Sequence, residues 1–507
     1  MTVTSQPAAL EGGAEPLHRG GGREPARGPA LPPEETPPEN FALYKKREQI
    51  YPKLVNGKFR ALKWGLLAAT LGIYYLLPWV RWPRAAGEPD QAVLVDFAGG
   101  RFYFFFIEIW PSELYYVTGL LILAAVGLFL ATALLGRVWC GYACPQTVWT
   151  DLFIAVERLI EGDRNARIRL ARADWSASKA MKKIAKHAIW LLIAAATGGA
   201  WVLYFHDAPT VVGELFTGAA PGSAYLFLGV LTFTTYVLAG TMREQVCIYM
   251  CPWPRIQAAL TDEETLQVTY RYDRGEPRGA HKKGDSWDAR GDCVDCKACV
   301  VACPMGIDIR DGAQLECINC ALCIDACDDI MAKVGRPTGL VAYDTDQNIV
   351  RRERSQKTTV KLFRARTAFY GGVFLLVSAI MVFGLTSRAT VETSVLRDRT
   401  PPFVLLSDGS IRNAYTVKIT NKANAERAFE ISAVGPDGVV LTGVGLDVRD
   451  NTTIVRVAGD DVRALRLFAT ASPEGLKSSE PLAFRVKETT SGETAVNDSV
   501  FLSARSR

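Results

Sequence analysis

Five apolar runs divide the chain, each close to the length of about 20 residues that a helix needs to cross a bilayer. They cover residues 64–81, 114–136, 184–205, 222–242 and 367–386. A further apolar run, Arg101 to Trp110, is too short to cross and is interpreted as an interfacial or re-entrant piece that leads into the second run. The pattern predicts an α-helical membrane domain with five spans.

The pattern changes to short alternating runs after about residue 390. The sequences YTVKITN (415–421), AFEISAV (428–434), TIVRVAG (453–459) and ALRLFATA (464–471) are separated by turn signals such as GPDG and SDG. Several short strands at this spacing predict a β-sandwich with an immunoglobulin-like plan. A fold of this kind does not by itself indicate a function.

The length of 507 residues and these changes of pattern indicate several domains. The first forty residues are rich in Gly, Pro and Glu and lack the apolar stretch of a secretory signal, so we expect a disordered arm. The predicted segments are an arm (1–40), spans one to four (41–262), a cysteine-rich domain (263–350), a basic linker with span five (351–389) and the β-sandwich (390–507).

The net charge of +5 is small for this length and implies no nucleic-acid partner, so the position of the basic residues matters more than their number. Seven Lys and Arg lie between Phe41 and Lys63, ten between Arg137 and Lys186, and residues 351–366 are strongly basic. By contrast, residues 206–221 carry none and residues 81–113 carry three. The positive-inside rule predicts a multi-pass protein of the bacterial inner membrane, with the N-terminus and the cysteine-rich domain in the cytoplasm and the β-sandwich in the periplasm.

All twelve cysteines lie between Cys140 and Cys327, in tight groups that suit metal or cluster binding better than a disulfide framework. Eight form the runs CVDCKACVVACP and CINCALCIDACD, which have the spacing of bacterial ferredoxins with two [4Fe-4S] clusters. Because the fourth cysteine of such a run ligates the other cluster, we predict two swapped quartets. They are Cys293, Cys296, Cys299 and Cys327 for the first cluster, and Cys317, Cys320, Cys323 and Cys303 for the second.

The alternative for these runs is zinc, which paired C-x-x-C motifs also bind. A zinc ribbon does not need the third cysteine or the Cys-Pro that Pro304 completes after the first run. The second run has Asp328 where this proline would stand, a difference that concerns the local turn and solvent access. Two linked clusters would form a relay for single electrons, which needs a donor and an acceptor.

The other four cysteines form two C-x-x-x-C-P motifs, each at the end of an apolar run: Cys140 and Cys144 before Pro145, and Cys247 and Cys251 before Pro252. A proline disfavours helical geometry at the residue before it, so each pair is predicted to lie at a break near the cytoplasmic end of a span. An internal repeat would bring the four sulfurs to one depth. They could bind a soft metal, with Cu(I) the leading candidate, or cycle between dithiol and disulfide, although cysteine is also a common packing residue.

Histidines give weaker signals. His187 lies at the start of the third apolar run, and His206 with Asp207 at its outer end could contact a metal or a quinone or be simple interfacial residues. His18 lies in the arm and His281 in a basic linker, where neither supports a role.

Four stretches, GRVWCGYACPQTVW, ERLIEGDRNARIRL, REQVCIYMCPWPRIQ and CINCALCIDACDDIMAKVGRP, occur in this order before a β-rich tail. From about residue 41 onward the chain closely resembles the FixG, RdxA or CcoG family of cytochrome c oxidase accessory proteins. The resemblance implies a polyferredoxin-like membrane protein for assembly of cbb(3)-type oxidase that reduces Cu(II) to Cu(I) in the cytoplasm. It also implies cluster binding by the eight ferredoxin cysteines, and it matches Cys140, Cys144, Cys247 and Cys251 to the family's membrane motifs.

Three functions are therefore compared. The first is copper reduction, with copper, oxidase subunits or assembly factors as partners and an unidentified electron donor. The second is a quinol-linked electron-transfer module, although the sequence has no C-x-x-C-H haem motif and no flavin fingerprint. The third is an assembly scaffold built on the β-sandwich, with the clusters as redox sensors.

Overall fold

The computed structural model describes residues 48–84, 88–282, 284–423 and 425–503. The predicted arm, residues 1–40, lies outside the described residues. From Ile50 onward the chain forms one unit.

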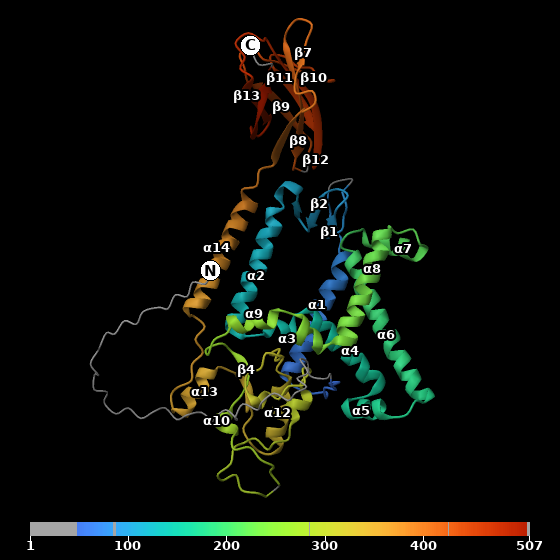
Figure 1. The fold of residues 1–507 in the computed structure, drawn as a ribbon, viewed down its shortest axis with the longest axis vertical. Coiled ribbons are helices and arrows are strands. Elements are labelled where there is room, and N and C mark those ends of the chain that lie inside the picture. The colour runs from blue at the N-terminus through green and yellow to red at the C-terminus, as the bar shows by residue number, and fades with distance from the viewer. Residues whose placement is uncertain (1–47, 85–87, 283, 424, 504–507) are drawn as a thin grey trace, which may run out of the picture. The chain divides into compact units, whose positions relative to one another are not determined.

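Four helices in the described part are long and apolar enough to cross a membrane, so the chain is a membrane protein (Figure 1). They are Lys58–Trp79, Pro111–Leu135, Gly222–Met242 and Ala365–Thr386. The predicted third span, 184–205, lies mostly within α6 (Ala177–Val202), whose first half carries four lysines and which is not among these four. The span at 184–205, and with it the total of five spans, therefore stays a prediction.

The other helices of the membrane part lie between the apolar ones, and α6, with 26 residues, is the longest of them. In chain order the helices are α1 (Lys58–Leu76), α2 (Tyr115–Leu135), α3 (Val138–Tyr142), α4 (Pro145–Glu161), α5 (Arg164–Arg172), α6 (Ala177–Val202), α7 (Ala208–Thr217), α8 (Gly222–Thr235), α9 (Trp253–Leu260) and, after the cysteine-rich domain, α14 (Ala365–Thr386). The membrane part also contains two 3₁₀ turns, η1 (Leu77–Trp79) and η2 (Pro111–Glu113), and two π-helical segments, η3 (Tyr236–Met242) and η4 (Val246–Met250).

Glycines allow two helix pairs to approach closely. In α6, a Cβ on Gly198 would lie 2.8 Å from the carbonyl oxygen of Leu228 in α8. In α2, a Cβ on Gly119 would overlap the side chain of Met381 in α14, and these two helices run side by side in Figure 1. Small residues at such crossings are typical of helices packed in membranes.

The short apolar run from Arg101 to Trp110 forms a β-hairpin, an element that the sequence interpretation did not specify. Strands β1 (Val93–Asp96), β2 (Arg101–Phe104) and β3 (Ile107–Ile109) make an antiparallel sheet in the order β1-β2-β3. Its backbone groups are thus paired within the sheet before the chain enters η2 and α2. Its interfacial position stays a prediction.

The cysteine-rich domain is framed by one antiparallel strand pair, β4 (Gln267–Tyr270) with β5 (Val341–Asp344). Between them lie α10 (Tyr272–Gly275), α11 (Ala298–Ala302), η5 (Ile309–Asp311) and α12 (Leu322–Lys333), and α13 (Asp346–Glu353) follows. The Asp325 carboxylate of α12 accepts hydrogen bonds from the backbone N–H groups of Phe59 (3.3 Å) and Arg60 (2.7 Å). A side chain of this domain therefore caps the first turn of α1.

Two antiparallel sheets form the C-terminal domain, which confirms the predicted β-rich fold. The strands are β6 (Val391–Arg397), β7 (Val404–Leu405), β8 (Ile411–Asn421), β9 (Arg427–Val434), β10 (Val440–Gly443), β11 (Thr452–Val457), β12 (Asp461–Ala471), β13 (Ser479–Glu488) and β14 (Thr494–Leu502). One sheet has the order β10-β12-β8-β6, with β7 also paired to β8, and the other the order β11-β9-β13-β14. The four alternating runs predicted as strands coincide with β8, β9, β11 and β12, and alternate apolar residues in them, such as Tyr415 and Phe429, are fully buried.

A buried ion cluster fixes α4 against its neighbours. The Glu157 side chain is 2% exposed and pairs with Arg243 at 3.0 Å, Arg167 at 3.1 Å and Lys186 at 3.4 Å. Burial by itself would raise the pKa of Glu157, but the three cations outweigh it and hold the pKa below its ordinary value. The carboxylate is therefore charged at neutral pH, and its contribution to stability is lost only as the pH falls below about 4.

Glu157→Gln is expected to lower the free energy of unfolding by about 3–5 kcal/mol, because it removes the buried counter-charge of Arg167 and Arg243, whereas Lys186 also pairs with Glu161 at 3.1 Å. Thermal unfolding in detergent measures the effect. Asp329→Asn, which breaks the exposed pair with Lys333, is the control and should change stability by about 0.5 kcal/mol or less. Equal losses in the two variants would contradict the expectation.

Candidate cluster and thiol site

The two ferredoxin-like cysteine runs adopt the same local backbone. In each run the residue before and the residue after the second cysteine have a left-handed conformation: Asp295 and Lys297 in the first, Asn319 and Ala321 in the second, with φ between 50° and 59°. A short helix, α11 or α12, then begins with the third cysteine in its first turn. Alternating conformations of this kind direct backbone N–H groups into one concavity, a feature of many iron–sulfur sites.

The fourth cysteine of each run lies with the first three of the other. The thiol of Cys327 is close enough to Cys299, Cys296 and Cys293 to interact with them electrostatically. Cys303, from the first run, lines one cavity with Cys317, Cys320 and Cys323. These positions agree with the two predicted quartets, although Cys299 of the first quartet lines the same cavity, and the assignment of each cysteine to a cluster stays a prediction.

The spacing of the sulfurs distinguishes a cluster from a single ion. Among the described residues, no three cysteine sulfurs lie within 4.8 Å of one another. A tetrahedral zinc site with Zn–S bonds of about 2.3 Å would need sulfurs about 3.8 Å apart. The wider spacing fits a cubane, whose four irons hold their ligands farther apart, better than zinc.

Burial strongly raises the pKa values of several thiols in this domain. Burial raises the pKa of Cys303 and of Cys327 to about 12, and that of Cys299 and of Cys317 to about 11. Because the thiolate is the ligand, iron must displace these protons on binding. The donor set therefore fits two [4Fe-4S] clusters.

The two C-x-x-x-C-P motifs have matching geometries, and each lies at the predicted break. Cys140 is in α3 and Cys247 in the π-helical η4, whereas Cys144 (ψ 127°) and Cys251 (ψ 121°) are extended. Each proline then leads into a new helix, α4 or α9. Because a residue before proline avoids the helical region, the chain turns at the second cysteine of each motif.

One cavity of about 260 Å³ brings the four motif cysteines together. Cys251 is exposed and the other three are half-buried. The wall is completed by residues of α9, of the α2–α3 connection and of the second ferredoxin run, among them Arg137, Trp253, Leu315, Glu316 and Ile318. The membrane motifs and the cysteine-rich domain thus share one site.

The first motif packs directly on the second ferredoxin run. A Cβ on Gly141 would lie 2.6 Å from the carbonyl oxygen of Ile318 and 3.0 Å from the Cα of Cys320, so only glycine fits. The neighbouring Tyr142 hydroxyl donates a hydrogen bond to the carbonyl oxygen of Cys320 at 3.2 Å. Cys140 and Cys247 also pack in one apolar cluster with Cys303 and Cys320. The quartet that contains Cys320 is therefore the one beside the membrane thiols.

Arg137 joins the three parts of this site. Its guanidinium donates hydrogen bonds to the carbonyl oxygens of Leu315 and Cys317 (3.3 Å) in the ferredoxin run, and of Pro254 (2.9 Å) after the second motif. Burial lowers the pKa of Arg137, an effect that the nearby Cys140 and Cys317 oppose. The planar guanidinium of arginine holds its N–H donors in a fixed geometry, so one side chain can bind carbonyl oxygens on both sides of the site.

Two of the membrane thiols, Cys140 and Cys247, have strongly raised pKa values. Burial raises the pKa of Cys140 to about 12, and Cys144 and Cys251 add to the rise, while Arg137 opposes it. Burial and the other three sulfurs raise the pKa of Cys247 to about 12 in the same way. A metal that binds these two sulfurs must displace their protons, which favours a soft, thiophilic ion over a hard one.

Relatives of the chain extend over nearly its whole length. It is 50% identical to protein RdxB of Cereibacter sphaeroides over 470 residues, which cover 91% of this chain and 98% of that protein. It is 49% identical to the nitrogen fixation protein FixG of Rhizobium meliloti, over 85% of this chain and 88% of that one, and 52% identical to RdxA of C. sphaeroides, over 85% and 91%. The chain belongs to the FixG/RdxA family.

Three family models match parts of this FixG-family protein. A "4Fe-4S dicluster domain" covers residues 242–346, a "4Fe-4S binding domain" covers residues 117–161, and an "IG-like fold at C-terminal of FixG" covers residues 381–504. The dicluster match includes all eight ferredoxin cysteines. This FixG-family protein therefore carries two [4Fe-4S] clusters and is an iron–sulfur redox protein.

Among solved structures, a FixG-related protein from Vibrio parahaemolyticus matches 22% of this chain and 96% of its own, with 22% identity and a TM-score of 0.20. A DUF4466 family protein from Parabacteroides merdae matches 22% of this chain and 43% of its own, with 15% identity and a TM-score of 0.16.

Two histidines of this FixG-family protein, His187 and His281, contact aromatic side chains. The Tyr236 hydroxyl lies 2.8 Å from Nδ1 of His187, and the His281 ring stacks on Trp287. Asp207, predicted with His206 as a metal or quinone contact, accepts a hydrogen bond from the N–H of Thr210 at the start of α7 and pairs with Arg81 at 2.7 Å. His18 lies outside the described residues.

Sequence reasoning missed two residues of the site, Arg137 and Gly141. Arg137 stands three residues before the first cysteine of a membrane motif, and Gly141 stands inside that motif. An arginine and a glycine beside a metal-binding motif are signals that could have been used. Their partners, Cys317 and Cys320, lie about 180 residues away in the chain.

Proposed function

We propose that this FixG-family protein is a membrane-bound Cu(II) reductase that supplies Cu(I) for assembly of a cbb(3)-type cytochrome c oxidase. The observation that carries the proposal is the shared cavity, in which four thiols face the backbone of the ferredoxin run that contains Cys317 and Cys320. The family resemblance supports the link to the oxidase, which the geometry alone does not address.

The chemistry is one-electron transfer followed by capture on sulfur. When bound, the two clusters supply single electrons. Cu(II) enters the cavity, takes one electron and becomes Cu(I), which thiolates prefer as ligands. Cys251 is the exposed member of the four thiols, so an ion can reach and leave the cavity beside it.

Arg137, Gly141 and Tyr142 hold the two halves of the site together. Their contacts keep the quartet with Cys320 against the membrane motifs, so this quartet is the one next to copper. The quartet with Cys327 then lies upstream, toward the electron donor. Electrons supplied by bound clusters would then pass from the quartet with Cys327 to the quartet with Cys320 and on to the cavity.

Reduction of copper for the oxidase requires that the thiol cavity opens to the cytoplasm of a Gram-negative cell. Residues 137–186 and 351–366, which flank the site in sequence, are the basic connections of the chain. The positive-inside rule places them on the cytoplasmic side of the inner membrane. With α6 as a fifth span, the β-sandwich lies in the periplasm.

Replacing Cys140, Cys144, Cys247 and Cys251 together by Ser is expected to abolish Cu(I) formation. The hydroxyl groups keep nearly the same shape but do not provide soft ligands. Anaerobic reduction of Cu(II) by the pre-reduced protein, freed of excess reductant and followed with a Cu(I)-specific chelator, measures the effect as Cu(I) formed per reduced cluster. Iron content and cluster absorbance should remain those of the unchanged protein. A variant that retains clusters and reduces Cu(II) at the normal rate would refute the thiol site.

A second candidate occupant of the cavity is an iron–sulfur cluster. The family model described as a "4Fe-4S binding domain" covers Cys140 and Cys144 but none of the eight ferredoxin cysteines. Iron analysis of the anaerobically purified protein distinguishes the two. Roughly eight irons per chain fit two cubanes and a thiol site left for copper, whereas roughly twelve would assign the cavity to a third cluster.

A further inference from the structure

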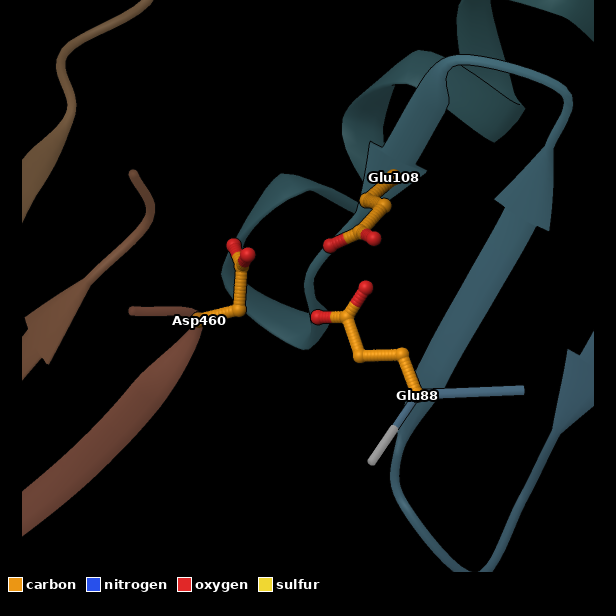
Figure 2. Close-up of side chains that lie close together, drawn as sticks. All are labelled: Glu88, Glu108 and Asp460. Carbon is orange, nitrogen blue, oxygen red and sulfur yellow. The ribbon is translucent and has the colours of Figure 1, made fainter. Parts of the chain in front are cut away.

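Three carboxylates that belong to no part of the thiol site meet between the β1–β3 sheet and the C-terminal domain. They are Glu88, in the segment before β1, Glu108 in β3, and Asp460 in the turn between β11 and β12. One oxygen of each lies within 4.8 Å of the others. Figure 2 shows the three carboxyl groups directed toward one another from separate elements.

Two of these side chains are buried and short of partners. Asp460 is 6% exposed and the Glu88 side chain 10% exposed. Both carboxylate oxygens of Glu88 and Oδ2 of Asp460 are inaccessible and make no hydrogen bond in the described structure. Burial removes the water from a carboxylate oxygen, and this costs free energy unless a hydrogen bond or a bound ion replaces the water. These oxygens are therefore expected to bind a ligand.

The nearby arginine side chains do not neutralise these three carboxylates. Nη1 of Arg101 lies 3.6 Å from Glu88 Oε1, but the guanidinium donates its hydrogen bond to the backbone carbonyl of Asp460 and stacks on the Trp110 ring. Arg84 donates to backbone carbonyls such as that of Pro89, and Arg388 pairs with Glu113. Three carboxylates against one contacting arginine leave an excess of about two negative charges.

Another carboxylate at the same junction is fully compensated. Glu113 of η2 pairs with Arg388 at 2.7 Å and with Lys422 at 2.8 Å, and Lys422 also pairs with Glu392 at 2.8 Å. These pairs join η2 to the C-terminal domain with balanced charge. The contrast shows that the deficit at Asp460 is local.

We propose that Glu88, Glu108 and Asp460 bind one hard divalent cation, Ca²⁺ in preference to Mg²⁺, which fastens the C-terminal domain to the β1–β3 sheet. Carboxylate oxygens are ligands of hard cations, and Ca–O distances of about 2.3–2.6 Å allow two oxygens across one ion to be up to about 5 Å apart. Mg²⁺ demands octahedral geometry and usually keeps several waters on one or two carboxylates, so three converging protein carboxylates suit Ca²⁺ better.

Titration behaviour agrees with a vacant cation site. Burial raises the pKa of Asp460 to about 6, and the Glu88 carboxylate adds to the rise. Burial and a neighbouring carboxylate raise the pKa values of Glu88 and Glu108 as well. Mutual repulsion thus favours protonation in the absence of a cation, and a divalent ion would displace the protons.

The first test is calcium binding to the full-length, cluster-loaded protein in detergent after treatment with a chelator. Equilibrium dialysis with radioactive Ca²⁺ should show one saturable site per chain, with a Kd of about 10⁻⁴ to 10⁻³ M, the range of extracellular calcium modules. Asp460→Asn and Glu108→Gln should each abolish this site. Asp437→Asn, which changes an exposed carboxylate of the same domain, should leave it intact.

Thermal unfolding provides a second readout that a merely misfolded variant would not mimic. Without calcium, Asp460→Asn should be at least as stable as the unchanged protein, because it removes repulsion. With saturating calcium, only the unchanged protein and Asp437→Asn should gain Tm, by about 2–4 °C. The proposal is overturned if the unchanged protein binds no more calcium than Asp460→Asn, or if Asp460→Asn is the less stable protein in the absence of calcium.

Discussion

Cys303→Ala is expected to remove the second cluster, although Cys303 belongs to the first cysteine run. In the structure Cys303 shares a cavity with Cys317, Cys320 and Cys323. The variant should lose roughly four irons per chain and retain the signal of one reduced cluster in electron paramagnetic resonance. Copper reduction should fall to background, because the lost cluster is the one beside the membrane thiols.

Cys327→Ala is the matched control, since it removes one ligand from the other quartet. It should also lose roughly four irons, yet the remaining cluster lies next to the cavity and can still give one electron to Cu(II) in a single turnover. Equal behaviour of the two variants in that single turnover would contradict the order of the relay. Loss of iron from the wrong quartet would contradict the swapped arrangement.

Gly141→Val is expected to slow copper reduction by about a hundredfold, because misplacement by 1 Å can have an effect of that size. The new side chain would overlap the backbone of Ile318 and Cys320, which lies 2.6–3.0 Å from the Cβ position. The first motif must then move away from the second ferredoxin run. Cluster content should be unchanged, since Gly141 provides no ligand.

The control for this substitution is Gly229→Val in α8, where a Cβ would meet no atom within 4 Å. Rates of electron transfer from the clusters to Cu(II), measured at matched cluster content, compare the two variants. A normal rate in Gly141→Val would show that the close contact between the motif and Cys320 is not part of the electron path. A slow rate in Gly229→Val would attribute the effect to helix packing in general.

Much of this fold could be predicted because its signals are local. The alternating runs at 415–421 and 464–471 are strands since their apolar residues fill the sandwich core, and the two ferredoxin runs have a spacing that hardly any other site requires. Each Cys-Pro step also fixes its own break, because the proline ring restricts the preceding residue.

Contacts between distant segments could not be predicted in this way. The pairing of Gly141 with Ile318, the bridge from Arg137 to Cys317, and the meeting of Glu88 with Asp460 each join residues whose separation in the chain is set by the tertiary fold. The run from Arg101 to Trp110 was read by its hydropathy, yet its pairing with β1 makes it a hairpin. The third predicted span is a further example. The lysines in the first half of α6 lower the hydropathy of this helix, and α6 is not among the four helices that are apolar enough to cross a membrane.

The most direct test of copper reduction is an anaerobic stopped-flow experiment that mixes the reduced, cluster-loaded protein with Cu(II). Cluster absorbance and a Cu(I)-specific chelator are followed together. The account predicts that one Cu(I) forms for each cluster oxidised, and that this coupling disappears when Cys140, Cys144, Cys247 and Cys251 are all serine. Clusters that stay reduced in the presence of Cu(II) would contradict it.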